Sequence, residues 1–168
     1  MTGGGAGPEI DLIRDSVETA TAKVQFYRVA FGAAGDQPVS LSDMGRLAAD
    51  TRRGSRAALD WAADETAPRD EVRLAFLAIL CAESAMPTGG TLTVGRSGTR
   101  WRIDGTAKAL RVEPSLWQAL SGGPVPHDID AARIHFALAK AAAAALGAPI
   151  EVQLGEARLS IAFDARGA

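Results

Sequence analysis

The chain has 168 residues, of which 47% are hydrophobic and 23% charged, so it is long enough to bury the core of one domain. Its formal net charge of −2, with basic residues clustered only in the short "RRGSR" run, argues against nucleic acid as a main partner. No apolar run reaches the ~18 residues of a membrane span, and no basic segment leads into an apolar stretch at Met1, so we expect a cytoplasmic protein without a membrane partner.

A long amphipathic helix is predicted first. Apolar residues recur from Ile10 to Phe31 in alternating steps of three and four, the spacing of a heptad seam. Pro8 suits the first helical turn, and Gly32 suits the position after the last turn. The seam comprises Ile10, Ile13, Val17, Ala20, Val24, Tyr27 and Phe31.

Three further apolar residues, Leu12, Phe26 and Val29, widen the apolar face of this helix beyond a two-helix seam. Burying the seam side chains is worth on the order of 10 kcal/mol in gross terms, which is too much to leave in water. We therefore expect a bundle helix that pairs with a symmetry mate in a homodimer or packs on its own domain.

After "GAAGDQP", a linker by composition, we place a domain boundary between residues 1–35 and 36–168. A helix is predicted from Leu41 to about Arg52, with Ser40 or Ser42 as its N-cap. A strand through "RAALDWAAD" (56–64) and a turn at "ETAPRD" lead to an apolar helix at 69–85.

A β-hairpin follows, formed by "TLTVGR" and "TRWRID" around a Ser-Gly turn. The remaining predicted elements are a short helix at "PSLWQAL", a long helix at 128–146, and two strands, "PIEVQLG" and "ARLSIAFD", joined at Gly155 and Glu156. The order is helix, linker, then αβαββααββ. It indicates an α+β protein in which a long bundle-type helix precedes a two-layer α/β sandwich.

Two helix-to-strand segments, 74–94 and 131–152, resemble the ATPase domain of histidine kinases. With "ATAKVQFYRVAFG" (20–32) before them, residues 11–163 resemble the ChpT-type histidine phosphotransferases, and "FYRVAFG" is the most specific short match. In that family a helical hairpin dimerises into a four-helix bundle and a degenerate kinase-like domain follows it. The resemblance implies a phosphorelay protein that passes phosphoryl groups between response-regulator receiver domains.

The residues expected of a kinase site are replaced here. Cys81 occupies the position of the asparagine that holds magnesium and phosphate, and a thiol is a poor ligand for a hard cation. Asp104 is followed by Thr106 and Lys108 where kinases have glycines, and "PVPHDID" replaces the glycine-rich phosphate turn. We expect no nucleotide, cofactor, metal site, ATPase or kinase activity.

The family's phosphotransfer uses a histidine on the first hairpin helix, and that histidine is absent from this sequence. "MTGGGAGPE" resembles the turn between the hairpin helices, so we expect the first helix to be missing and the chain to be inactive as written. His127 is expected in an exposed loop, and His135 packed and hydrogen-bonded on the late helix. A non-catalytic, receiver-binding scaffold is the alternative function.

Receiver docking near the hairpin turn in related proteins nominates Leu12, Arg14 and Asp15 as partner contacts. Cys81, the only cysteine, excludes an internal disulfide and a multi-cysteine metal cluster, and we expect it to be a buried structural thiol in a reducing compartment. The "RRGSR" arginines Arg52, Arg53 and Arg56 are expected on a solvated surface.

Overall fold

The structure is a computed structural model that describes residues 7–33 and 35–165. Helix α1 (Pro8–Phe31) begins the described chain, with Pro8 in its first turn and the acidic Glu9 and Asp11 at the positive end of the helix dipole. Most of the expected hairpin turn, residues 1–6, lies outside the described residues. Gly32 ends the helix with an extended backbone, and a Cβ there would lie 2.0 Å from the Arg28 carbonyl oxygen. Glycine is therefore needed for close approach rather than for the left-handed conformation that the C′ prediction implied.

A five-stranded sheet forms the second layer of the domain, in the order β2-β4-β5-β7-β6. Strands β2 and β4 are parallel, and every other neighbouring pair is antiparallel. Its strands are β2 (Ala57–Trp61), β4 (Gly90–Ser97), β5 (Arg100–Thr106), β6 (Glu151–Leu154) and β7 (Arg158–Asp164). The parallel pair requires a crossover, and the predicted apolar helix provides it.

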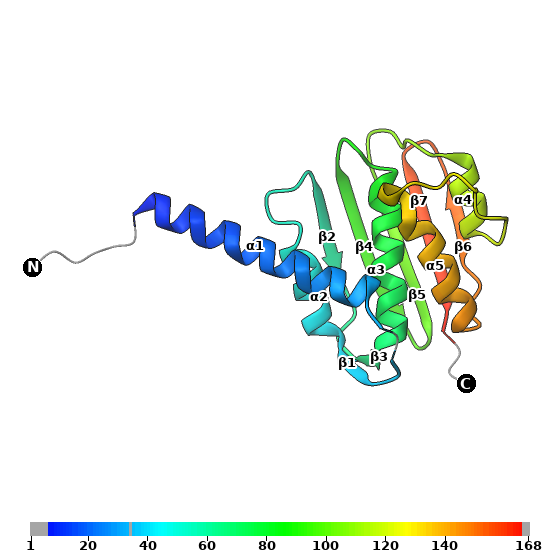
Figure 1. Cartoon of the computed structure of the whole chain (residues 1–168), viewed down its shortest axis with the longest axis horizontal. Helices are drawn as coiled ribbons and strands as arrows, with labels where there is room; N and C mark the ends of the chain where they lie inside the picture. Colours follow the sequence, from blue (N-terminus) through cyan, green and yellow to red (C-terminus); the bar gives the residue numbers. More distant parts are fainter. Residues whose placement is uncertain (1–6, 34, 166–168) are drawn as a thin grey trace, which may run out of the picture.

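Helices cover one face of this sheet, and α1 projects away from the domain along much of its length (Figure 1). The covering helices are α3 (Arg69–Ser84) and α5 (Ile134–Ala145), with α4 (Pro114–Leu120) beside α5 and α2 (Leu41–Asp50) beneath α1. Ser40 is the N-cap of α2, because its hydroxyl accepts from the Asp43 backbone N–H at 3.3 Å. The two-layer α+β fold is confirmed, and the elements predicted in the order αβαββααββ are all present, with two short strands added.

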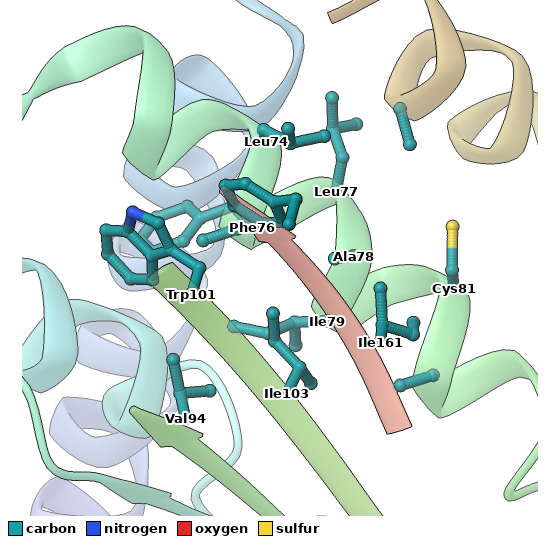
Figure 2. Packing of buried hydrophobic residues seen from close by; sticks show 14 of the residues in the cluster. Leu74, Phe76, Leu77, Ala78, Ile79, Cys81, Val94, Trp101, Ile103 and Ile161 are labelled. Atoms are coloured by element: carbon teal, nitrogen blue, oxygen red, sulfur yellow. The ribbon is translucent and has the colours of Figure 1, made fainter. Parts of the chain in front are cut away.

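The core lies between α3 and the sheet (Figure 2). Trp101 and Ile103 of β5 point toward the helices and are buried, whereas Arg102 and Asp104 occupy the opposite, open face of the sheet. Cys81 of α3 is also in this core with no exposed surface, and burial raises the pKa of its thiol well above the usual value. The prediction that Cys81 is buried is confirmed.

Two parts of the predicted secondary structure were wrong. The sequence "ETAPRD" contains a short strand, β3 (Thr66–Pro68), which pairs antiparallel with β1 (Pro38–Ser40). These strands are three residues long and contain prolines, so no alternation could reveal them. The late helix begins at Ile134 after a single 3₁₀ turn (Ala131–Arg133), not at Asp128, because the Asp130 carboxylate pairs with Arg133 at 2.8 Å and caps no backbone N–H.

Candidate functional site

The C-terminal half of α1 packs on the domain. Phe26 is 2% exposed and stacks on Phe76 of α3, with ring centroids 4.2 Å apart. The Arg73 guanidinium of α3 donates to the Ala30 carbonyl at 3.3 Å, and the Asp70 carboxylate accepts the backbone N–H of Gly35. The end of α1 and its linker are therefore held by α3 at several points.

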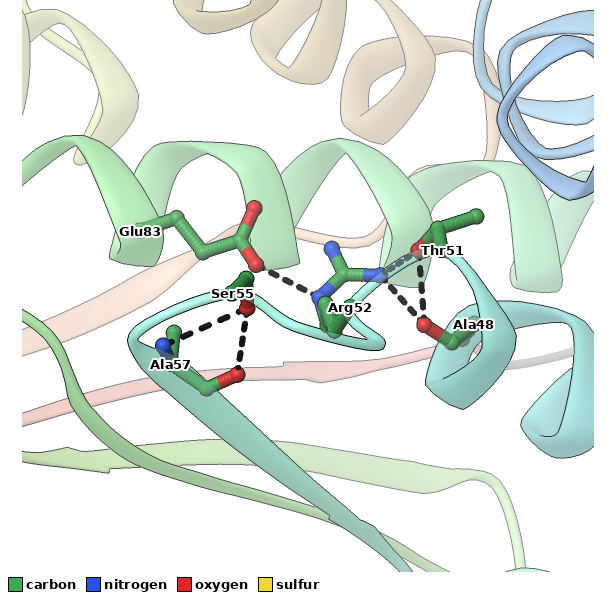
Figure 3. A network of polar contacts seen from close by, with 6 residues as sticks. All are labelled: Ala48, Thr51, Arg52, Ser55, Ala57 and Glu83. Carbon is green, nitrogen blue, oxygen red and sulfur yellow. Dashed lines mark hydrogen bonds and ion pairs between the residues drawn. The ribbon is translucent and has the colours of Figure 1, made fainter. Parts of the chain in front are cut away.

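Arg52 contacts both the buried face of α1 and α3, and Figure 3 shows its interactions with Glu83, Thr51 and Ala48. Its guanidinium lies 4.9 Å from the centre of the Phe26 ring, pairs with Glu83 of α3 at 2.5 Å, and donates to the Ala48 carbonyl at 2.6 Å. The prediction that Arg52 lies on a solvated face was wrong, because α2 ends at Asp50 and turns the side chain inward. Its neighbours Arg53 and Arg56 are exposed, as predicted.

The residues of α1 that pack on the domain are not those of the seam. Ala22, Phe26, Val29 and Ala30 are buried, and at about 100° per residue their centre lies about 160° around the helix from that of the seam. In the single chain the seven seam residues Ile10, Ile13, Val17, Ala20, Val24, Tyr27 and Phe31 are exposed. Helix α1 thus has two apolar faces, of which the domain covers one, and what covers the seam stays a prediction.

The three nominated partner contacts all lie on the exposed N-terminal half of α1. Leu12 and Asp15 are one turn apart on the same side of the helix, and Leu12 is 68% exposed. Arg14 lies on another side, 4.0 Å from the Asp11 carboxylate. A partner that contacts Leu12 and Asp15 through one flat surface would therefore meet Arg14 only at the edge of the interface or not at all.

The structure does not bring together the two residues that correspond to the kinase site. Cys81 lies on the helix side of the sheet, whereas Asp104 faces the open side, in a shallow hollow lined by Arg102 and Arg158. An aspartate on that face is separated from the α3 surface by the sheet itself. Asp104 therefore does not serve a site beside Cys81.

Side chains fill the region between α4 and α5. Trp117 of α4 is 3% exposed and meets Phe136 of α5 edge to face at 5.5 Å. The segment before α4 is tied to the end of α3 by the Arg111 N–H, which donates to the Ala85 carbonyl at 2.9 Å, and Lys140 of α5 donates to the Gly123 carbonyl. The interior between α4 and α5 is thus filled, whereas residues 124–130, which replace the kinase phosphate turn, are exposed or half-buried.

Adenine nucleotides with Mg²⁺ are therefore expected to leave the melting temperature of the protein unchanged at millimolar concentration. Cys81→Asn, which restores the kinase ligand type, is expected to bind no better, because the thiol is fully buried. Differential scanning fluorimetry of both proteins checks this. Because ligand at 100 times Kd stabilises by about 2.7 kcal/mol, a shift of several degrees would contradict the prediction.

Neither histidine is placed to accept a phosphoryl group from a partner on α1. His127 is exposed in a turn before the 3₁₀ segment, as expected. His135 is 9% exposed beside Phe136, and its Nε2 has no hydrogen-bond partner among the described residues, so the expected hydrogen bond at this atom was wrong. Burial lowers the pKa of His135, and the charge of Arg133 lowers it further.

This lowered pKa makes the stability of the protein sensitive to acid. The unfolded chain begins to protonate His135 near pH ~6.5, while the folded protein keeps it neutral to lower pH. Stability is thus fully present above about pH 6.5 and falls as the pH drops toward the folded pKa. His135→Leu should flatten the decline in urea midpoint from pH 7.5 to 5.5, whereas His127→Leu should retain it; equal declines in both variants would refute this role.

Among the residues that the structure describes, no helix is long and apolar enough to cross a membrane. Nor do residues 7–33 and 35–165 gather three or more His, Cys, Asp or Glu side chains in a position to hold a metal ion. The candidate functional surface therefore consists of α1, its contacts with the domain and the hollows beside it.

The fold is that of the histidine-kinase ATPase-like domains. The histidine kinase domain of the Erythrobacter litoralis EL346 blue-light activated histidine kinase superposes with a TM-score of 0.57 at 14% identity, covering 98% of this chain and 88% of that one. A solved bacterial phosphotransferase is more similar, with a TM-score of 0.77 and 28% identity over 96% of this chain and 81% of that chain.

Sequence comparison assigns the family. The chain belongs to the histidine phosphotransferase C-terminal domain family, which matches residues 41–158. It is 32% identical over 136 residues to the protein phosphotransferase ChpT of Brucella abortus (strain 2308), covering 77% of this chain but 65% of the length of that protein. The predicted ChpT-type resemblance is confirmed.

Proposed function

We propose that this chain comprises the second hairpin helix, within residues 1–35, and the degenerate kinase-like domain, residues 36–168, of a two-component phosphorelay protein. The intact protein would pass phosphoryl groups between response-regulator receiver domains in the cytoplasm, where those regulators act. The observation that carries the proposal is the division of α1 into two opposite apolar faces, one on the domain and one exposed. A bundle helix that also supports a domain needs both faces.

The exposed seam is the surface for the remaining bundle helices. Its three-and-four spacing suits knobs-into-holes packing, and Tyr27 and Phe31, both exposed, stack on it with ring centroids 5.6 Å apart. We assign to this seam a first hairpin helix and, across a twofold axis, the equivalent helices of a second copy. The result is a homodimer joined by a four-helix bundle.

The phosphoryl acceptor would be a histidine on a helix packed against the seam, because His127 and His135 lie elsewhere on the domain. A ring nitrogen of that imidazole attacks the phosphorus of a receiver's aspartyl phosphate, so that the N–P bond forms as the P–O bond to the aspartate breaks. Attack by the carboxylate of a second receiver reverses the step. No nucleotide is consumed, which accords with the filled α4–α5 region.

The test is transfer of labelled phosphate from a phosphorylated receiver domain to the protein. This chain alone is expected to retain no label, whereas the chain extended by a preceding helix with its histidine should be labelled. Val17→Glu/Val24→Glu in the seam should abolish bundle formation and labelling. Thr21→Glu/Gln25→Glu adds the same two charges on exposed polar positions of α1 and should preserve both. Failure of the extended chain to accept phosphate from any receiver would refute the proposal.

The placement of both histidines away from α1 favours one alternative, a scaffold that binds receivers without transferring phosphate. Receiver binding by this chain, together with the absence of an in-frame helix carrying a histidine in the DNA before Met1, would support that alternative.

A further inference from the structure

A groove follows one side of α1 where the helix lies over the loop between α2 and β2. It consists of two hollows that share Lys23: one of about 530 Å³ toward the C-terminal half of α1, and one of about 460 Å³ toward its N-terminal half. The first is walled by Tyr27, Arg56 and the end of α3 near Met86. The second is lined by Asp15, Thr19 and Gly54, among others. We name these two hollows together the α1 groove.

The middle and the C-terminal end of the α1 groove carry uncompensated positive charge. Glu83, the carboxylate on the groove wall, is paired with Arg52, and Arg53 is paired with Asp50 at 2.8 Å and Glu18 at 3.5 Å. The side chains of Lys23 and Arg56 are exposed and form no ion pair with any described residue. Asp15, at the N-terminal end, is the one acidic lining residue of the groove without such a partner among the described residues.

Arg52 forms part of the wall of the groove and is fixed before any ligand arrives. Its Nε and one terminal nitrogen are held by Glu83, the Ala48 carbonyl and the Thr51 hydroxyl, while the other terminal nitrogen makes no hydrogen bond with the described residues (Figure 3). A guanidinium ordered in this way loses little side-chain entropy when it binds an anion.

We propose that the α1 groove is a docking site for an acidic segment of the protein that binds α1. The occupant is a chain segment rather than a compact phosphate because the hollow that Lys23 and Arg56 both line continues past Lys23 into the second hollow, so the groove extends along α1 beyond these two cations. The apolar wall at Met86 and Pro87 suits the side chains between carboxylates. The groove also continues the side of α1 that bears Leu12 and Asp15, the nominated receiver contacts.

This inference takes the identity of the partner, a receiver domain, from the proposed function. The binding of an acidic segment to the groove does not depend on that function. The test variant is Lys23→Glu/Arg56→Glu, which reverses the two unpaired charges at exposed positions. Its matched control is Arg102→Glu/Arg158→Glu, the same change in net charge at exposed positions on the open face of the sheet. Circular dichroism and melting curves establish that both variants are folded.

Receiver affinity, measured by calorimetry at 50 and 200 mM salt, is expected to fall at least tenfold in the groove variant at low salt and to lose most of its salt dependence. The control variant should bind like the unaltered chain. If the groove variant and the unaltered chain bind the receiver equally well, the groove is not a docking site, and the proposed function is unaffected.

A second experiment tests the docking proposal even if the chain binds no receiver. Failure to bind a receiver would count against the proposed function alone. A decaglutamate peptide is titrated into isotopically labelled protein and followed by NMR. Shifts confined to the backbone signals of Lys23, Tyr27 and residues 51–57, lost in the groove variant, support the groove. Shifts produced by inorganic phosphate but not by the peptide would identify a small-anion site and overturn the proposal, as would no shift with either.

Discussion

Phe26→Ala is expected to destabilise the protein by about 3–5 kcal/mol, the range for truncating a buried aromatic side chain. The substitution removes the ring that stacks on Phe76 at 4.2 Å and that covers the Arg52 guanidinium. Both partners lie in the domain, so the loss should appear in domain unfolding as well as in the order of α1. Urea denaturation followed by tryptophan fluorescence measures it.

The adjacent aromatic residue provides the control. Tyr27 is 45% exposed and belongs to the seam, so Tyr27→Ala should cost less than about 1 kcal/mol in the isolated chain. If the two substitutions destabilise equally, α1 is not seated on the domain by its Phe26 face, and the division of the helix into two faces fails.

Much of the fold could be predicted because local and long-range preferences agree. The run Leu74 to Ile79 is apolar on every side and is buried, and both hairpins have alternating strands around glycine turns. The existence of α1 was equally clear from its heptad spacing. These signals depend only on periodicity and turn chemistry, which are local to the chain.

Which face of α1 the domain covers could not be predicted. The spacing of apolar residues defined the seam most clearly. The domain nevertheless covers Phe26 and Val29, which the sequence placed only at the margin of the apolar face. The choice depends on the position of Phe76 and Arg52 in space, and no helical period reports that position. For the same reason Lys23 was not singled out: an exposed lysine on a helix acquires meaning only from the loop that faces it.

Arg52 was misplaced for a related physical reason. A run of three arginines in five residues is typical of a solvated surface, but Arg52 follows the last turn of α2, where its side chain donates to the Ala48 carbonyl of that helix and pairs with Glu83. A basic residue at a helix C-terminus was the available signal. It does not identify the carboxylate that completes the pair, because Glu83 lies 31 residues further along the chain.

Glu71→Ala is the second substitution expected to have a large effect, about 3–5 kcal/mol of lost stability. The Glu71 carboxylate, on the first turn of α3, accepts the indole N–H of Trp101 at 2.8 Å and pairs with Arg96 at 3.1 Å. The side chains of Glu71 and Arg96 are 6% and 9% exposed, so the substitution leaves the Trp101 indole N–H unpaired in the core and Arg96 without its buried partner.

Arg96 also pairs with Glu65 at 3.3 Å, and this second carboxylate separates the effect of burial from that of charge. The Glu65 side chain is 70% exposed, so Glu65→Ala removes the same formal charge from the same arginine and should cost no more than about 1 kcal/mol. Glu71→Ala/Arg96→Leu removes both buried charges and should recover part of the loss, since the remaining defect is the unpaired Trp101 N–H and the vacated volume. If the double variant is no more stable than Glu71→Ala, the loss of the buried partner of Arg96 is not what destabilises the single variant, and the large effect must come from the unpaired Trp101 N–H and the packing around it.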